Sequence, residues 1–303
     1  MEPLALSRAV AEALDAGRPV VALETSVLAH GLPRPRNLEA LERMDRAVRD
    51  AGAEPAWVSV LGGAVRVGTP PEELRRLAEE GGAAKVARRD LPAAVASGRV
   101  GATTVSATVW AAHRAGVEVV ATGGTGGVHP GTGDVSADLL ELARTPVTLV
   151  CSGPKSVLDP AATAERLEEL GVLVLGYRCD RLPFFVVREA EVPLEHRVET
   201  AEDAARVARA RRALGVESAV LLCNPVAEAH ALDREEVRLA VGECLGRAAR
   251  EGVAGKAVTP FLLSCLAERT QGRSLEANLA LLEANARLAG EVARTLESGG
   301  AQV

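Results

Sequence analysis

The sequence predicts an α/β protein: a single three-layer α/β/α domain over residues 1–303, built on a mainly parallel mixed sheet. Apolar segments of strand length alternate along the chain with amphipathic segments of helix length, a pattern typical of parallel sheets covered on both faces. Hydrophobic residues make up 48% of the chain but aromatic residues only 2%, so Ala, Val and Leu must build the core. We find no linker rich in proline or serine, which favours one domain over two.

Short apolar runs between turn residues mark the strands. They are expected, in order, at 19–23, 56–61, 64–67, 84–88, 117–121, 147–151, 172–175 and 219–223. Most of them lead into a helical segment, which implies parallel neighbours. Gly62 and Gly63 instead join two strands directly, a strong signal for an antiparallel hairpin.

Capping residues and amphipathic periodicity mark the helices. The N-terminal segment 1–17 carries Glu2 early and predicts an amphipathic helix, not a signal peptide. Asn37 is a plausible N-cap, and Thr69 before Pro70 predicts another helix start. Further helices are expected, in order, at 37–51, from 70 onward, and at 103–115, 136–143, 156–170, 201–214, 234–250, 260–268 and 275–296.

The overall charge and the cysteines exclude several classes of protein. The net charge is −6 and we find no long basic run, so a nucleic-acid surface is not expected. The longest apolar runs fall well short of the roughly 20 residues of a membrane span. The five cysteines are scattered without C-x-x-C spacing, so neither a disulfide framework nor a zinc site is expected. These features predict a cytoplasmic protein.

Lysine is rare in this chain, which uses arginine for nearly all its positive charge. Lys85, Lys155 and Lys256 are the three lysines among 35 basic residues. Arginine rarely loses its proton, so a retained lysine is a candidate for amine chemistry. Lys155 follows a buried strand and a tight turn, where desolvation or a second cation would favour a nucleophilic amine. A capping lysine in a solvated loop is the plain alternative.

Two further groups have candidate roles near strand ends. Lys85 is predicted either to bind an anion and also to lower the pKa of Lys155 through its positive charge, or to form a salt bridge in a turn. Glu24 ends an apolar strand, where a carboxyl group can act as a general acid, although a cap or an ion pair is as common. Lys256 has no predicted role beyond a charge at the start of a helix.

The glycine-rich segment 122–138 lets a backbone approach a ligand closely. It matches a dinucleotide motif only loosely, and no P-loop lysine follows it. His129, Asp134 and Asp138 are candidate acid–base groups or ligands of a divalent ion that keeps several waters, such as Mg²⁺ or Mn²⁺. The alternative is that Asp134 or Ser136 caps the next helix.

Motifs along nearly the whole chain resemble those of the pseudouridine-5′-phosphate glycosidase family, also called the indigoidine-synthase-A-like family. They are ALETSVLAHGLPRPRN (22–37), KVARRDLP (85–92), GATTVSAT (101–108), ATGGTGGVH (121–129), DVSADLLELART (134–145), VTLVCSGPKSVLD (147–159), NPV (224–226), GKAVTPFLL (255–263) and SLEANLALL (274–282). The loop between His129 and Asp134 is shorter than in some relatives, and Pro154 stands where a small residue is more usual.

The resemblance implies reversible cleavage of the C–C glycosidic bond of pseudouridine 5′-phosphate to uracil and ribose 5-phosphate. It implies that Lys155 is the nucleophile, that Glu24 is the proton donor, and that Asp134 binds one Mn²⁺ per subunit. The implied substrate-binding residues are Lys85, the main chain at Val105, His129, Ser136, Ala137, Asp138 and Asn278. It also implies a three-layer α/β fold and a homotrimer. Another Schiff-base sugar-phosphate lyase of aldolase type, or a non-catalytic sugar-phosphate sensor, are the alternatives.

Overall fold

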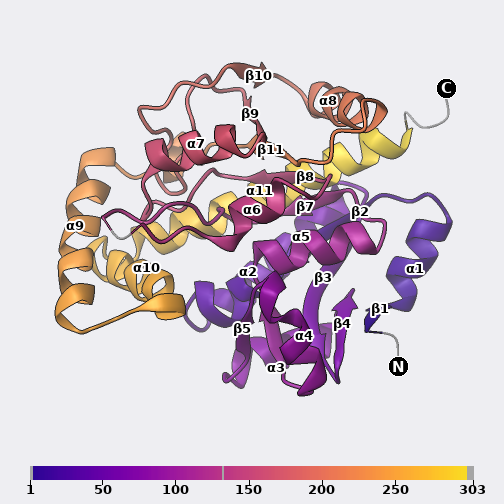
Figure 1. Cartoon of the computed structure of the whole chain (residues 1–303), viewed down its shortest axis with the longest axis horizontal. Coiled ribbons are helices and arrows are strands. Elements are labelled where there is room, and N and C mark those ends of the chain that lie inside the picture. The colour runs from indigo at the N-terminus through magenta and orange to yellow at the C-terminus, as the bar shows by residue number, and fades with distance from the viewer. Residues whose placement is uncertain (1–2, 132, 299–303) are drawn as a thin grey trace.

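The computed structural model describes residues 3–131 and 133–298, and the strands of this part form one mixed sheet (Figure 1). The strand order is β1-β4-β3-β2-β7-β8-β11-β9-β10, and β5 and β6 extend the sheet beside β3. The strands are β1 (Leu4–Leu6), β2 (Val20–Glu24), β3 (Glu54–Leu61), β4 (Ala64–Val67), β5 (Ala84–Val86), β6 (Gly101–Thr103), β7 (Val119–Ala121), β8 (Thr148–Cys151), β9 (Leu173–Tyr177), β10 (His196–Val198) and β11 (Val220–Cys223).

The sheet is mainly parallel, as the sequence predicts. Among the described strands, β3 pairs antiparallel with β4 and with β6, and the other neighbours pair in parallel. Gly62 and Gly63 join β3 to β4 with φ angles of 58° and 73°. A two-residue hairpin of this kind needs positive φ at both positions, which glycine adopts without strain. The predicted hairpin is therefore confirmed.

Helices cover both faces of the sheet, which confirms the predicted three-layer fold. Val20 and Ala22 of β2 face one layer, and Val21 and Leu23 face the other. Figure 1 shows α5 and α6 on one side of the sheet and the long helix α11 on the other. The first layer contains α1 (Arg8–Asp15), α4 (Leu91–Ala96), α5 (Val105–Arg114), α6 (Ala137–Leu142) and α7 (Pro160–Glu169). The second contains α2 (Arg36–Asp50), α3 (Pro71–Glu79), α8 (Ala201–Ala213), α9 (Arg234–Arg250), α10 (Val258–Arg269) and α11 (Arg273–Ser298).

Several predicted helix starts are wrong. The N-terminal segment first forms β1, and α1 begins only after Ser7, whose side chain accepts a hydrogen bond from the Val10 N–H. Asn37 is not a cap: it lies inside α2, and its buried amide donates to two backbone carbonyls instead. Pro70, not Thr69, is the N-cap of α3, because the Thr69 hydroxyl bonds the Trp57 carbonyl.

The helix expected at 156–170 is shorter at its start. Its N-cap is Asp159, whose carboxylate accepts from the Ala162 N–H, and Pro160 occupies the first turn. Ser156 instead closes the preceding turn by donating its hydroxyl hydrogen to the Phe184 carbonyl. The segment before Asp159 therefore belongs to the turn that carries Lys155.

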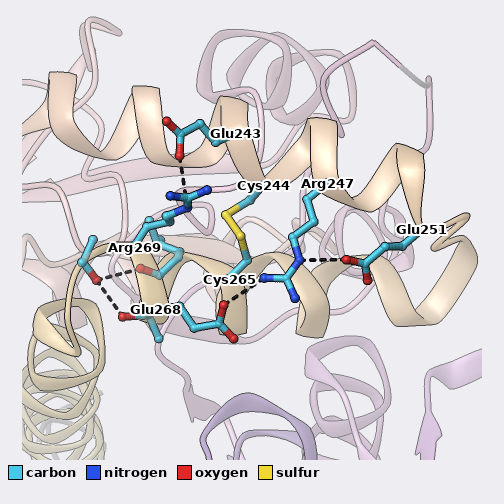
Figure 2. The surroundings of a disulfide bond; sticks show 10 residues. Glu243, Cys244, Arg247, Glu251, Cys265, Glu268 and Arg269 are labelled. Atoms are coloured by element: carbon cyan, nitrogen blue, oxygen red, sulfur yellow. Dashed lines mark hydrogen bonds and ion pairs between the residues drawn. A yellow bond between two sulfur atoms is a disulfide. The ribbon is translucent and has the colours of Figure 1, made fainter.

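A disulfide joins Cys244 of α9 to Cys265 of α10, which corrects the expectation that no disulfide forms (Figure 2). The two cysteines are 21 residues apart, on neighbouring helices, so their spacing matches no short motif. Within the described residues the other three cysteines are buried free thiols, as expected: Cys151, Cys179 and Cys223. The cytoplasmic location rested partly on the absence of disulfides, and it stays a prediction.

Ion pairs flank the disulfide on both sides and bind the two helices further (Figure 2). Arg247 of α9 pairs with Glu268 of α10 at 2.9 Å, and Arg269 of α10 pairs with Glu243 of α9 at 3.1 Å. The α9–α10 hairpin is thus a firmly connected unit. In the described part of the chain, no helix combines the length and apolar character needed to cross a membrane.

Candidate active site

A cavity of about 320 Å³ opens at the carboxyl ends of the strands, where parallel sheets usually bind ligands. Every residue that the sequence analysis proposes for the site lines this cavity: Glu24, Lys85, Val105, His129, Asp134, Ser136, Ala137, Asp138, Lys155 and Asn278. They come from segments far apart in the sequence. The sheet therefore brings together groups that the sequence could only place near separate strand ends.

Glu24 is the last residue of β2, and its carboxyl group is almost fully buried at 4% exposure. The Ser26 hydroxyl donates to one carboxylate oxygen at 2.5 Å, and the Thr122 hydroxyl donates to the other. A buried carboxyl group needs such partners, because an unpaired one loses the solvation of water without compensation. The two hydroxyls hold Glu24 in one orientation toward the cavity.

Lys155 is half-buried and follows β8 through a tight turn at Gly153. A Cβ atom at Gly153 would lie 1.8 Å from the Pro183 carbonyl oxygen, and the φ angle there is 74°. The position therefore requires glycine. The Lys155 N–H donates to the Thr125 carbonyl at 3.1 Å, so the turn is fastened to the glycine-rich loop. The backbone at Lys155 is therefore held in place by the turn at Gly153 and by its hydrogen bond to the glycine-rich loop.

Lys85 lies on β5, and its pKa is lowered below the usual lysine value. Burial is the main cause, and the positive charge of Lys155 adds to it, while Asp138 and Glu24 oppose the shift. The two lysines are therefore close enough to interact across the cavity. A pair of cations in one partly desolvated cavity is well suited to an anionic ligand.

Asp138 anchors two backbone segments of the cavity wall. Its carboxylate accepts hydrogen bonds from the Ser106 N–H at 2.9 Å and the Gly126 N–H at 3.0 Å. The Ser136 hydroxyl accepts from the Asp138 N–H, which confirms Ser136 as the helix cap. A Cβ at Gly126 would lie 2.1 Å from the Ser136 hydroxyl oxygen, so the loop packs directly on the cap.

His129 and Asp134 lie side by side, because the His129 N–H donates to the Asp134 carbonyl at 2.9 Å. The short loop between them therefore still brings Asp134 to the cavity. Burial lowers the pKa of His129, with Asp134 opposing and the charges of Lys85 and Lys155 assisting, so its imidazole is neutral at pH 7.

Several residues of the cavity had no role assigned to them from the sequence. Ser26 and Thr122 hold Glu24, and Thr259 reaches to 3.4 Å from the His129 ring. His30 also lines the cavity, and burial together with the Lys85 charge lowers its pKa. Short polar residues in loops have no periodicity that would reveal them.

Two lysines, a buried carboxyl group and a glycine-rich loop line one cavity at the strand ends, which makes this cavity the candidate active site of an α/β enzyme. The chain belongs to the family described as Indigoidine synthase A like protein, whose model matches residues 9–295.

Two relatives that align with nearly the whole chain are both named pseudouridine-5′-phosphate glycosidase. The chain is 49% identical over 297 residues to the pseudouridine-5′-phosphate glycosidase of Symbiobacterium thermophilum, with 96% of each chain covered. It is 50% identical over 294 residues to that of Myxococcus xanthus, covering 96% of this chain and 97% of the relative.

Solved structures share the fold. The prealnumycin C-glycosynthase AlnA in complex with ribulose 5-phosphate matches with a TM-score of 0.92 and 40% identity, covering all of both chains. An indigoidine synthase A-like protein from Thermotoga maritima matches with a TM-score of 0.90 and 40% identity, covering 98% of each chain.

Proposed function

We propose that this enzyme reversibly cleaves the C–C glycosidic bond of pseudouridine 5′-phosphate to uracil and ribose 5-phosphate. The observation that carries the proposal is the convergence of Lys155, Glu24 and Lys85 on one cavity. The names of the relatives support the substrate, and AlnA, described with ribulose 5-phosphate, supports a phosphorylated sugar in the same fold.

The bond to be broken explains why a lysine is needed. An ordinary glycosidase protonates a leaving oxygen, but a C-nucleoside has no oxygen at the scissile bond. The electron pair of the C1′–C5 bond leaves with C5 of uracil, which takes up a proton, so C1′ of the sugar needs an electron donor. The lone pair of an amine bonded to C1′ supplies those electrons as the C=N bond of an imine forms.

The proposed sequence of steps uses two side chains. The neutral amine of Lys155 bonds to C1′ through its Nζ and breaks the bond from C1′ to the ring oxygen, which takes a proton from Glu24. The proton that the amine loses passes to C5 as the C1′–C5 bond breaks, leaving the sugar as a protonated imine on Lys155. Water then hydrolyses the imine and releases ribose 5-phosphate, and the proton set free returns Glu24 to its acid form.

The phosphate group would lie among the remaining polar groups of the cavity. Lys85 would supply a positive charge, and the main chain at Val105 begins α5, where the positive end of a helix favours anions. His129, Asn278 and the stretch from Ser136 to Asp138 would add further contacts. Asp138 would act through the backbone that it holds, because its carboxylate already accepts two N–H groups.

We also propose that Asp134 binds one Mn²⁺ per subunit. Among the described residues, no three His, Cys, Asp or Glu side chains are placed to share one ion. A hard ion that takes one protein carboxylate and keeps most of its waters would need Asp134 alone. When bound, the ion would orient water and the uracil base, and we assign it no bond-making step.

The homotrimer is likewise a proposal. Val135 and Leu140 leave large apolar side chains exposed, at 42% and 52%, and Val135 lines the cavity. A subunit contact there would cover apolar surface next to the active site.

The test is uracil release from pseudouridine 5′-phosphate, followed by absorbance, with and without Mn²⁺. We expect turnover by the natural chain and a loss of about 10²- to 10⁴-fold in kcat for Glu24→Gln, the range for a general acid. Turnover of other sugar phosphates but not this one would favour an aldolase-type lyase. Binding of ribose 5-phosphate without turnover of any substrate would favour a sensor.

A further inference from the structure

Lys256, the third lysine of the chain, bridges two segments of the cavity wall. It lies in the short 3₁₀ turn Gly255–Ala257 just before α10. Its Nζ pairs with Asp90 at 2.6 Å and donates to the Lys85 carbonyl at 3.2 Å. Lys256 and Asp90 are 166 residues apart in sequence, so this contact ties the start of α10 to the segment that carries Lys85.

Asp90 connects this bridge to the backbone around Lys85. The Asp90 carboxylate oxygen that pairs with Lys256 also accepts from the Ala87 N–H at 2.9 Å. Burial acts to raise the pKa of Asp90, but the hydrogen bonds from Lys256 and the Ala87 N–H lower it below the usual value. Asp90 is therefore charged at neutral pH, and it fixes the turn that ends β5.

The first turn of α10 also reaches the other phosphate-binding candidate. The Thr259 hydroxyl lies 3.4 Å from Nε2 of His129, and Pro260 and Leu263 line the cavity. At its far end α10 is held to α9 by the Cys244–Cys265 disulfide (Figure 2). The helix α10, which forms this wall of the cavity, is therefore held near its start by Lys256 and further along by the disulfide. Of these two contacts, the one made by Lys256 lies next to the cavity.

We propose that Lys256 is a positioning residue of the active site. Its bridge holds the first turn of α10 against β5 and so keeps Lys85 and His129 in the geometry that binds the sugar phosphate. This rests on the proposed function. The pair is partly exposed, with side-chain exposures of 48% and 28%, so it contributes little to stability. Misplacing a binding group by about 1 Å, in contrast, can cost on the order of 100-fold in rate.

The test compares Lys256→Met, Lys256→Arg, Asp90→Asn and the double variant Lys256→Met/Asp90→Asn. The matched control is Arg269→Met, which breaks the Arg269–Glu243 pair elsewhere on the same hairpin. The measurements are kcat and KM for uracil release, the affinity for ribose 5-phosphate by calorimetry, and the thermal midpoint.

Lys256→Met is expected to raise KM about tenfold and change kcat by less than about threefold, with a thermal midpoint close to that of the natural chain. Lys256→Arg should restore most of the affinity, since arginine can make the same bridge. Asp90→Asn should behave like Lys256→Met, and the double variant should be no worse than either, because both changes break one contact.

Three results would overturn the proposal. The first is Lys256→Met kinetics that match those of Arg269→Met. The second is additive losses in the double variant, and the third is unchanged affinity in Asp90→Asn; either of these would mean that Lys256 acts on ribose 5-phosphate without Asp90. If the natural chain releases no uracil, the proposed function fails. The calorimetric affinities for ribose 5-phosphate then decide the role of Lys256 separately.

Discussion

The three lysines show how environment separates side chains of one type. Lys155 follows a tight glycine turn, Lys85 is partly buried beside a second cation, and Lys256 is an exposed residue that bridges two segments. Strand-end positions made Lys155, Lys85 and Glu24 candidates, and the family resemblance implied that they share one site. The sequence could not reveal the role of Lys256, because its partner Asp90 is close to it only after the chain folds.

Lys85 gives a pH dependence whose sign follows from its lowered pKa. Between that pKa and the ordinary value of 10.5, the folded state binds fewer protons than the unfolded chain. The contribution of Lys85 to the free energy of unfolding therefore rises with pH across this window. At neutral pH, below the window, protonated Lys85 lowers the stability.

Replacing Lys85 with Met should therefore stabilise the protein at pH 7 and weaken its binding of ribose 5-phosphate. The gain in stability over the natural chain should shrink as the pH approaches 10.5. Urea unfolding at several pH values measures this, with Arg269→Met as the exposed-cation control. A Lys85→Met variant that is less stable at pH 7 would contradict the assignment.

Helices and turns were predictable where local signals decide them. Gly62 and Gly63 fixed the hairpin, and Ser136 capped its helix as expected. The prediction that Asn37 caps a helix was wrong, because its side-chain amide donates hydrogen bonds to two backbone carbonyls of other segments. No local sequence pattern indicates such contacts. The disulfide was missed for the same reason, since it depends on how α9 and α10 pack.

Removing the disulfide should destabilise the chain without abolishing the fold. Closing a loop of 21 residues stabilises a protein by about 3 kcal/mol, mainly by restricting the unfolded chain. We expect Cys244→Ser/Cys265→Ser to lose an amount of this order in chemical denaturation. Dithiothreitol should destabilise the natural chain similarly and leave the variant unchanged. Equal stability with and without the disulfide would refute this.

The architecture of the whole molecule was the most predictable feature. Alternating strands and helices with an Ala-, Val- and Leu-based core predicted a three-layer fold, because parallel strands need cover on both faces. The strands β1, β6 and β10 were missed: β1 was included in the predicted N-terminal helix, and neither Gly101–Thr103 nor His196–Val198 is an apolar run. The proposed association between subunits would use exposed apolar surfaces such as Val135 and Leu140.

The proposed trimer predicts a solution mass three times that of the chain. Light scattering coupled to size-exclusion chromatography measures this mass. We expect Leu140→Glu to lower it, because a charge would be buried in the contact, while Leu239→Glu, on an exposed site of α9, should leave it unchanged. A monomer mass for the natural chain would contradict the proposal.

The imine on Lys155 is the step on which the proposed mechanism depends. The enzyme is incubated with ribose 5-phosphate and borohydride, and its peptides are analysed by mass spectrometry. We predict that the reduced sugar phosphate is attached to Lys155, and that Lys155→Ala forms no such adduct and releases no uracil. Attachment to Lys85 instead, or full uracil release by Lys155→Ala, would contradict the mechanism.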